Sequence, residues 1–215
     1  MSLKKASIVI ILILLIDQIS KIYIKTHFVL GEDIAVFSWF KILFVENDGM
    51  AWGAKLSDFT SFISDRTAKV ILTLFRLIAI VGIGYWLFTS IKNKGSRVLI
   101  IAISLIFAGA LGNIIDSVLY GVLFNDSYGQ VAAFLPDGGG YDALLHGKVV
   151  DMLHFPMWKG YIPEWIPFWG GDYFTFFEPV FNIADMAISS GVGALLVFNK
   201  KAFPKTTEKE DIATA

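Results

Sequence analysis

The chain has no cysteine, few charged residues and no dense run of lysine and arginine, and each shortage excludes a class of protein. Without cysteine there are no disulfides, thiolate metal sites or thiol nucleophiles, so any metal-free chemistry would fall to serine, histidine, lysine or carboxylates. The net charge is −1 and no segment is basic enough for a phosphate-binding face, so we expect no nucleic-acid partner. Only 17% of residues are charged and 55% are hydrophobic, with a mean hydropathy of +0.64. These values are typical of a chain whose solvent is lipid.

Four segments are long and apolar enough to cross a membrane, which takes about 20 helical residues. The first follows a basic start, as a secretory signal does, but it runs into Asp17 without a small-residue cleavage site, so we expect a retained helix. The predicted fold class is an α-helical integral membrane protein with four transmembrane helices, in which residues 1–215 form a single membrane domain. The segments lie near Ala6–Ile24, Thr67–Ile91, Val98–Leu119 and Pro179–Phe198.

Basic residues flank the same ends of all these segments, which predicts the orientation of the chain. By the positive-inside rule these ends, with both termini, lie in the cytoplasm. The two long connections, Thr26–Arg66 and Tyr120–Glu178, then lie on the outer face. The flanking residues are Lys4, Lys5, Lys92, Lys94, Arg97, Lys200, Lys201 and Lys205.

The two outer connections differ in composition. Residues 34–45 are rich in β-branched and aromatic side chains and precede Glu46-Asn-Asp-Gly49, a turn signal, so we predict a small sheet or hairpin on the membrane surface. The second connection is interrupted by Gly138-Gly-Gly140 and by prolines, and its later part is dense in aromatic residues, which suits the headgroup layer. These aromatic residues are Trp158, Tyr161, Trp165, Trp169 and Tyr173.

Five ionisable residues fall inside the predicted spans, where a charge is costly and therefore suggests a function. They are Asp17, Lys21, Arg76, Asp116 and Asp185, and all except Arg76 lie toward the outer ends of their segments. Asp17 and Lys21 are four residues apart and share one helix face. We interpret these two as an ion pair that fixes the geometry of the helix end.

Asp151 and Asp185 are the strongest candidates for chemistry. Asp185 lies near the start of the last segment, with Asn182 three residues earlier on the same predicted face. Asp151 follows a short apolar stretch and can reach the depth of Asp185 if its loop folds back. Two carboxylates held close share a proton, so one can act as a base toward water while the other protonates a scissile carbonyl. Asn113 and Asn182 could orient this pair or stabilise an oxyanion, and neither a metal nor a cofactor is required.

Five short blocks, in this order along the chain, resemble the signature blocks of the lipoprotein signal peptidase family. The resemblance extends over roughly Ile13 to Ile188. It implies an aspartic endopeptidase of the bacterial inner membrane that removes the signal peptide from diacylglyceryl-modified prolipoproteins, cutting before the lipidated cysteine. The blocks are Asp17-Gln-Ile-Ser-Lys21, Glu46-Asn-Asp-Gly-Met-Ala-Trp52, Gly112-Asn-Ile-Ile-Asp116, Val149-Val-Asp151 and Phe181-Asn-Ile-Ala-Asp185.

The same resemblance implies roles for single residues and a more detailed fold. Asp151 and Asp185 match the catalytic aspartates of the family. The implied fold adds a small extracytoplasmic β-cradle and an interfacial loop helix, and the implied partners are lipid-modified prolipoproteins and membrane lipid, with a monomeric chain. Residues that shape the site or contact the substrate are Asn47, Gly49, Asn113, Asn182, Asp17, Lys21 and Asp116.

The chain departs from the family pattern at two places. Where the family usually has arginine after the aspartate of the Gly-Asn block, this chain has Ser117. Our hypothesis is that Arg76, from a neighbouring helix, supplies the missing positive charge to Asp116. The stretches from Asn113 to Asp151 and from Asp151 to Asp185 are also longer than in compact members.

Three other interpretations remain open. A small transporter or channel would line an ion path with the buried charges and predicts polar groups along the whole bilayer depth. A metal site near Asp142, His146, Asp151 and His154 is disfavoured because it lacks the helix-borne His-Glu-x-x-His pattern. A non-enzymatic scaffold for lipoproteins would not need both aspartates. We assign the small residues Gly109, Gly112, Ala184, Ala187, Ser190, Gly191 and Ala194 to helix packing.

Overall fold

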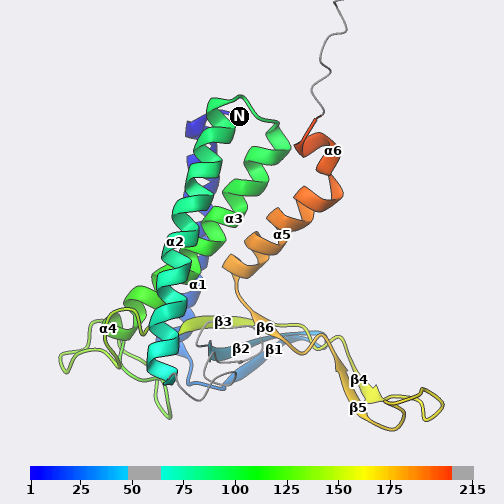
Figure 1. The fold of residues 1–215 in the computed structure, drawn as a ribbon. Helices are drawn as coiled ribbons and strands as arrows, with labels where there is room; N and C mark the ends of the chain where they lie inside the picture. Colours follow the sequence, from blue (N-terminus) through cyan, green and yellow to red (C-terminus); the bar gives the residue numbers. More distant parts are fainter. Residues whose placement is uncertain (48–63, 205–215) are drawn as a thin grey trace, which may run out of the picture.

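The computed structural model describes residues 1–47 and 64–204, which form a bundle of helices standing on a small antiparallel sheet (Figure 1). Three helices are long and apolar enough to cross a membrane: α1 (Leu3–His27), α2 (Asp65–Lys92) and α3 (Arg97–Ile115) with its continuation to Leu123. A fourth apolar helix, α5 (Ile183–Val197), is shorter. The predicted helical segments are therefore found, the last one shorter than expected.

Helix α3 lies at the centre of the bundle, because it packs against α1, α2 and α5. Of its span, 50% is buried, against 17% for α1 and for α2, whose outward faces are left for lipid. Small residues bring its backbone close to that of α5: a Cβ on Gly109 would lie 2.2 Å from the carbonyl oxygen of Ala184. The assignment of these two residues to helix packing is confirmed.

The N-terminus, the α2–α3 connection and the short helix α6 (Asn199–Ala202) lie at one end of the bundle (Figure 1). Ser96, the N-cap of α3, also donates a hydrogen bond from Oγ to the carbonyl oxygen of Ala202 at 3.0 Å. The basic residues of these segments therefore share one end, as predicted, and the sheet occupies the other. Lys205 lies outside the described residues.

The last helix begins later than predicted, at Ile183, because Asn182 forms its N-cap. The Asn182 side chain accepts from the backbone N–H of Asp185 at 2.9 Å, and the Asp185 carboxylate accepts from the backbone N–H of Asn182 at 3.2 Å. This reciprocal pair is a capping box. The placement of Asn182 on the helix face of Asp185 was therefore wrong: Asn182 precedes the helix, with extended backbone.

The main sheet has four antiparallel strands in the order β1-β2-β3-β6. The hairpin predicted for residues 34–45 is confirmed as β1 (Asp33–Phe37) and β2 (Phe40–Asn47). Glu46 and Asn47, predicted in a turn, instead end β2, and Gly49 lies outside the described residues. The sheet is completed by β3 (Val149–His154), which pairs with β2, and by the edge strand β6 (Val180–Phe181), which pairs with β3.

The second outer connection contains strands where the resemblance implied an interfacial helix. A π-helical turn, η3 (Asp116–Tyr120), and the three-residue α4 (Gly121–Leu123) continue α3, and a separate hairpin of β4 (Trp158–Tyr161) and β5 (Tyr173–Phe176) follows β3. Within the described parts of both outer connections we find no helix that could lie along a membrane surface. Prolines, glycines and aromatic residues dominate the hairpin, and they favour turns and strands over helix.

A buried ion pair fixes the edge of the sheet to the end of α1. The ammonium of Lys25 contacts the carboxylate of Glu46 on β2 and donates to Ser127 Oγ at 2.9 Å. The pair lies among the rings of Phe44, Phe124 and Tyr141. Because Glu46 directly precedes Asn47, this contact holds the end of β2 that reaches the site described next.

Candidate active site

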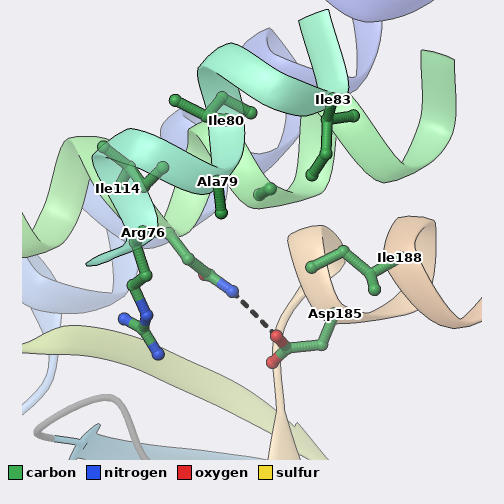
Figure 2. Close-up of a pocket in the computed structure, with 9 residues that line it drawn as sticks. Arg76, Ala79, Ile80, Ile83, Ile114, Asp185 and Ile188 are labelled. Carbon is green, nitrogen blue, oxygen red and sulfur yellow. Dashed lines mark hydrogen bonds between the residues drawn. The ribbon is translucent and has the colours of Figure 1, made fainter. Parts of the chain in front are cut away.

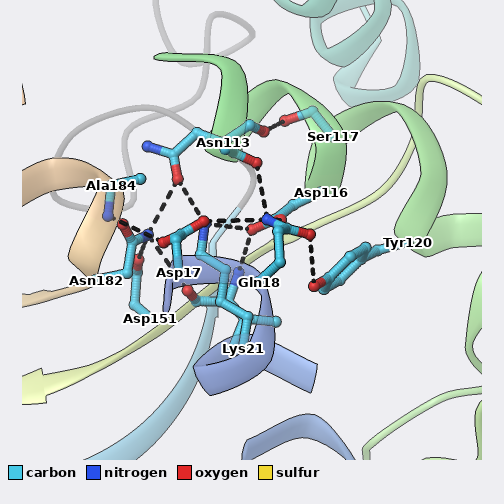
Figure 3. Close-up of polar contacts among 12 residues, drawn as sticks. Asp17, Gln18, Lys21, Asn113, Asp116, Ser117, Tyr120, Asp151, Asn182 and Ala184 are labelled. Carbon is cyan, nitrogen blue, oxygen red and sulfur yellow. Dashed lines mark hydrogen bonds and ion pairs between the residues drawn. The ribbon is translucent and has the colours of Figure 1, made fainter. Parts of the chain in front are cut away.

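Asp151, shown in Figure 3, and Asp185, shown in Figure 2, come from different parts of the fold and are linked through Asn182 and Asn113. Asp151 lies in the middle of β3, opposite Val45 of β2, and its side chain is buried with 3% exposed. Asp185 is the third residue of α5 and is half-buried. The loop does fold back, as the sequence analysis required, and it returns as strand β3 through the sheet.

Three carboxamides hold the two carboxylates. Asn182 donates from Nδ2 to Asp151 Oδ1 at 2.7 Å, and Asn47 donates from Nδ2 to Asp151 Oδ2 at 3.1 Å. Asn113 donates from Nδ2 to Asp185 Oδ1 at 2.8 Å. Asn182 also donates to Asn113 Oδ1 at 3.1 Å, so a continuous chain of hydrogen bonds joins the two aspartates.

The environment of Asp151 favours its protonated form. Burial and, to a smaller extent, the negative charge of Asp185 raise the pKa of the Asp151 carboxyl to about 7, although the hydrogen bonds from Asn47 and Asn182 act to lower it. A carboxyl with a pKa near neutrality can donate a proton at physiological pH. Asp185 is thus close enough to act electrostatically on Asp151, and proton sharing between the two stays a prediction.

A second polar cluster, directly beside this pair, is built around the buried ammonium of Lys21 (Figure 3). Lys21 Nζ lies 3.0 Å from Asp17 Oδ2 and 2.8 Å from Asp116 Oδ2, and it donates to Asn113 Oδ1 at 2.9 Å. The ion pair predicted between Asp17 and Lys21 is confirmed. Lys21 is therefore the ion-pair partner of Asp116, and Arg76, which we hypothesised would supply the positive charge, attracts Asp116 electrostatically as well.

The carboxylates of this cluster also hold the backbone next to each candidate catalytic residue. Asp17 Oδ1 accepts from the N–H of Ala184 at 2.9 Å, and Asp116 Oδ2 accepts from the N–H of Val150 at 3.3 Å. These are the residues immediately before Asp185 and Asp151. One ammonium thus fixes, through two carboxylates, the backbone of both elements that carry the pair.

Two members of the cluster were missed in the sequence analysis. Gln18 donates from Nε2 to Asp116 Oδ1 at 2.9 Å and to Asp17 Oδ2 at 3.0 Å, and Tyr120 Oη donates to Gln18 Oε1 at 3.2 Å. Gln18 lies in the block Asp17-Gln-Ile-Ser-Lys21, between Asp17 and Lys21, and this position was the only sequence feature that could have indicated its role. Nothing in the sequence indicated that η3 would turn Tyr120 toward α1.

Arg76 lies on α2 at the edge of a cavity of about 220 Å³ between α2, α3 and α5 (Figure 2). Asn113 and Asp185 form the polar end of this cavity, and isoleucines such as Ile80 and Ile188 form its apolar walls. The guanidinium donates from Nη1 to Ser117 Oγ at 3.3 Å. Arg76 therefore reaches the residue that replaces the usual arginine, and its positive charge attracts Asp185 as well as Asp116.

The other interpretations find less support in the described residues. They contain no group of three or more His, Asp or Glu side chains placed to hold a metal ion, and Asp142 instead pairs with Arg66 at 2.9 Å. Among the described residues, the buried acidic side chains are Asp17, Glu46, Asp116 and Asp151, and all lie at the sheet end of the bundle. An ion path would need such groups along the whole depth.

Comparison with known proteins agrees with this geometry. The family model described as signal peptidase (SPase) II matches residues 9–200. The chain is 45% identical over 205 residues to the lipoprotein signal peptidase of Porphyromonas gingivalis, covering 94% of this chain and 84% of that protein. It is 36% identical to the lipoprotein signal peptidase of Amoebophilus asiaticus, covering 89% of this chain and 75% of that protein.

A solved structure of a bacterial membrane enzyme superposes with a TM-score of 0.55 at 25% identity, covering 99% of this chain and 96% of that one. The sequence match and the structural match both extend over nearly the whole chain. The chain is thus a multi-pass membrane protein, and it belongs to the signal peptidase II family.

Proposed function

We propose that this chain removes signal peptides from diacylglyceryl-modified prolipoproteins with Asp151 and Asp185 as its catalytic pair. The observation that carries the assignment is the hydrogen-bonded chain from Asp151 through Asn182 and Asn113 to Asp185. It holds two acidic groups in unlike surroundings, as proton transfer in both directions requires. Family membership supports the substrate class, since the relatives are lipoprotein signal peptidases.

The different surroundings of the two aspartates suggest different roles. Asp151, buried and with a pKa near 7, is the proton donor to the scissile carbonyl. Asp185 lies in the first turn of α5, where the helix dipole favours a carboxylate, and it accepts hydrogen bonds from Asn113 and the Asn182 backbone. Asp185 also borders the cavity, so it is the base toward the attacking water.

The reaction then balances within the pair. Water attacks the carbonyl carbon and loses a proton to Asp185, while Asp151 protonates the carbonyl oxygen. The tetrahedral diol collapses: its C–N bond breaks, Asp185 returns a proton to the leaving amine, and Asp151 recovers one from a hydroxyl. The products are a signal peptide with a free carboxylate and a lipoprotein with a free amino group on its lipidated cysteine.

We further propose that α5 is a fourth crossing and that residues 1–215 act as a single, monomeric membrane domain. The basic residues at the end opposite the sheet support cytoplasmic termini in the bacterial inner membrane. The pair then lies toward the outer face, close to membrane lipid. The cavity between α2, α3 and α5, with its apolar walls, is suited to an apolar part of the substrate next to the scissile bond.

The test is cleavage of a purified, lipid-modified prolipoprotein by the purified chain in detergent with EDTA present. Electrophoresis should show the shift from precursor to mature form, and mass spectrometry should find the new amino terminus at the lipidated cysteine. A precursor that lacks the lipid serves as the matched control. An intact lipidated precursor, or a cut elsewhere, would refute the proposed activity.

The dependence of cleavage on pH should follow the protonation of the Asp151 carboxyl. Because the donor must be protonated and its pKa is about 7, kcat should fall as pH rises through about 7, by up to tenfold per unit. Removing the Asn47 amide in Asn47→Ala takes away a hydrogen bond that lowers this pKa, so the decline should move upward by up to about one unit. An unmoved profile in Asn47→Ala would argue against Asp151 as the donor.

Arg76 should act by attracting the Asp185 side chain and by lining the substrate cavity. We expect Arg76→Met to lower kcat/KM about tenfold, the loss of roughly one charged hydrogen bond, with Arg76→Lys recovering part of it. Arg66→Met is the matched control, since Arg66 lies on the same helix in an exposed pair with Asp142. Equal activities of the Arg76 and Arg66 variants would exclude this role.

A further inference from the structure

The hairpin of β4 and β5, residues 158–176, is an ordered element that stands apart from the rest of the fold. It forms its own two-stranded sheet and projects beyond the main sheet, away from the helices (Figure 1). Its loop is closed by backbone hydrogen bonds, among them Ile162 N to Asp172 O and Gly171 N to Ile162 O, both at 2.9 Å. We call residues 158–176 the aromatic hairpin.

The aromatic hairpin presents large apolar side chains outward. Phe168 is 98% exposed, Trp165 is 81% exposed and Tyr161 is 72% exposed. Phe168 also has a φ of 72°, a left-handed conformation that is unfavourable for a bulky residue. The described residues leave nearly all of Phe168 uncovered, and exposed apolar patches of this kind mark contact surfaces.

Its position in the fold indicates what the contact is. The hairpin is entered three residues after β3 and left three residues before β6, which leads directly into α5. It is therefore joined to the sheet end of the molecule, where α5 begins and where, in a bilayer, hydrocarbon gives way to headgroups. Tryptophan and tyrosine are enriched at that depth, because their rings bury apolar surface while keeping a polar atom near water.

The net charge of the hairpin indicates which kind of membrane contact it can make. Its charged residues are Lys159, Glu164 and Asp172, which sum to −1. A surface of this charge gains nothing from anionic lipids, so its binding would depend on apolar contact alone. A basic amphipathic helix, in contrast, binds a membrane more strongly when the lipids are anionic.

We propose that the aromatic hairpin is a membrane-surface anchor that inserts the rings of Trp165, Phe168 and Trp169 into the boundary between headgroups and acyl chains. β3, which carries Asp151, continues into the hairpin, so the anchor holds this edge of the sheet against the bilayer. Resting on the proposed function, this would keep the catalytic pair at the depth where a lipid-anchored precursor presents its scissile bond.

The absence of cysteine makes a direct test simple, since a single cysteine can be labelled without removing others. Spin labels at Phe168→Cys and, separately, Trp165→Cys are compared with a label at Asp137→Cys, an exposed site outside the hairpin, in the earlier part of the same outer connection. In phosphatidylcholine nanodiscs we expect the hairpin labels to collide mainly with oxygen and the control label mainly with a water-soluble nickel complex. Anionic lipid and salt should leave this difference unchanged.

Two outcomes would overturn the anchor. Nickel accessibility at 165 and 168 equal to that at 137 would place the hairpin in water. Protection from both reagents would mean that protein covers it, either a second copy or a polypeptide partner. The depth measurement needs no catalysis, so it stands even if the chain fails to cleave a prolipoprotein. If cleavage is established, Trp165→Ser with Phe168→Ser and Trp169→Ser should slow it several-fold in bilayers.

Discussion

Asparagine in place of Asp151 or of Asp185 is expected to lower kcat for prolipoprotein cleavage by about 100-fold to 10,000-fold, the usual range for loss of a general acid or base. Asparagine keeps the shape of the side chain but cannot take up and release the transferred proton. At both positions the neighbouring carboxamides remain, so the change should act on chemistry more than on folding. The measurement is single-turnover cleavage at saturating enzyme.

The matched control is Asp137→Asn, which makes the same chemical change at an exposed position of the second outer connection. It should cleave at the wild-type rate. Both dyad variants should also unfold at the wild-type temperature to within a few degrees. Full activity in either one would remove that aspartate from the mechanism and with it the two-carboxylate reaction.

Methionine in place of Lys21 is expected to lower the free energy of unfolding by about 3–5 kcal/mol, because it leaves the carboxylates of Asp17 and Asp116 buried without their shared cation. Cleavage should fall as well, since these carboxylates hold the backbone N–H groups of Ala184 and Val150. Denaturant titration in detergent micelles, followed by circular dichroism, measures the first effect.

Lys41→Met provides the comparison for that experiment. Lys41 pairs with Asp33 at 2.7 Å, but both side chains are more than one third exposed, so its loss should change stability by less than about 1 kcal/mol. Adding Asp17→Asn and Asp116→Asn to Lys21→Met should restore part of the lost stability by removing the unpaired charges. Equal stabilities of the Lys21 and Lys41 variants would mean that the buried cluster does not hold the fold together.

The sequence was informative wherever a physical rule acts on neighbouring residues. Apolar length predicted the helices, basic flanks predicted their shared end, and the spacing of Asp17 and Lys21 predicted their ion pair. The rich β-branched content of residues 34–45 likewise predicted β1 and β2. Each of these features depends on residues of one continuous stretch of the chain.

Contacts between segments that are far apart in the sequence were harder to predict. No residue near Lys21 in the sequence indicates that its ammonium also pairs with Asp116. We therefore assigned the positive charge beside Asp116 to Arg76, whose guanidinium donates a hydrogen bond to Ser117. The capping box was overlooked because the motif is usually written with serine or threonine and glutamate, while this chain uses Asn182 and Asp185. The interfacial helix came from the resemblance alone, and the hairpin is the part of the chain where the local composition was the better guide.

The close approach of α5 to α3 also has a consequence for biosynthesis. Because α5 is synthesised after α1 and α3, its contact at Gly109 and Ala184 would form after Asp17, Lys21 and Asp116 have been made. Until it docks, Asp151 lacks the Asn182 amide and has no second carboxylate beside it. Under the proposed mechanism, a nascent chain that is still entering the membrane therefore cannot cleave a substrate. It becomes active when α5 has been made and has packed against α3.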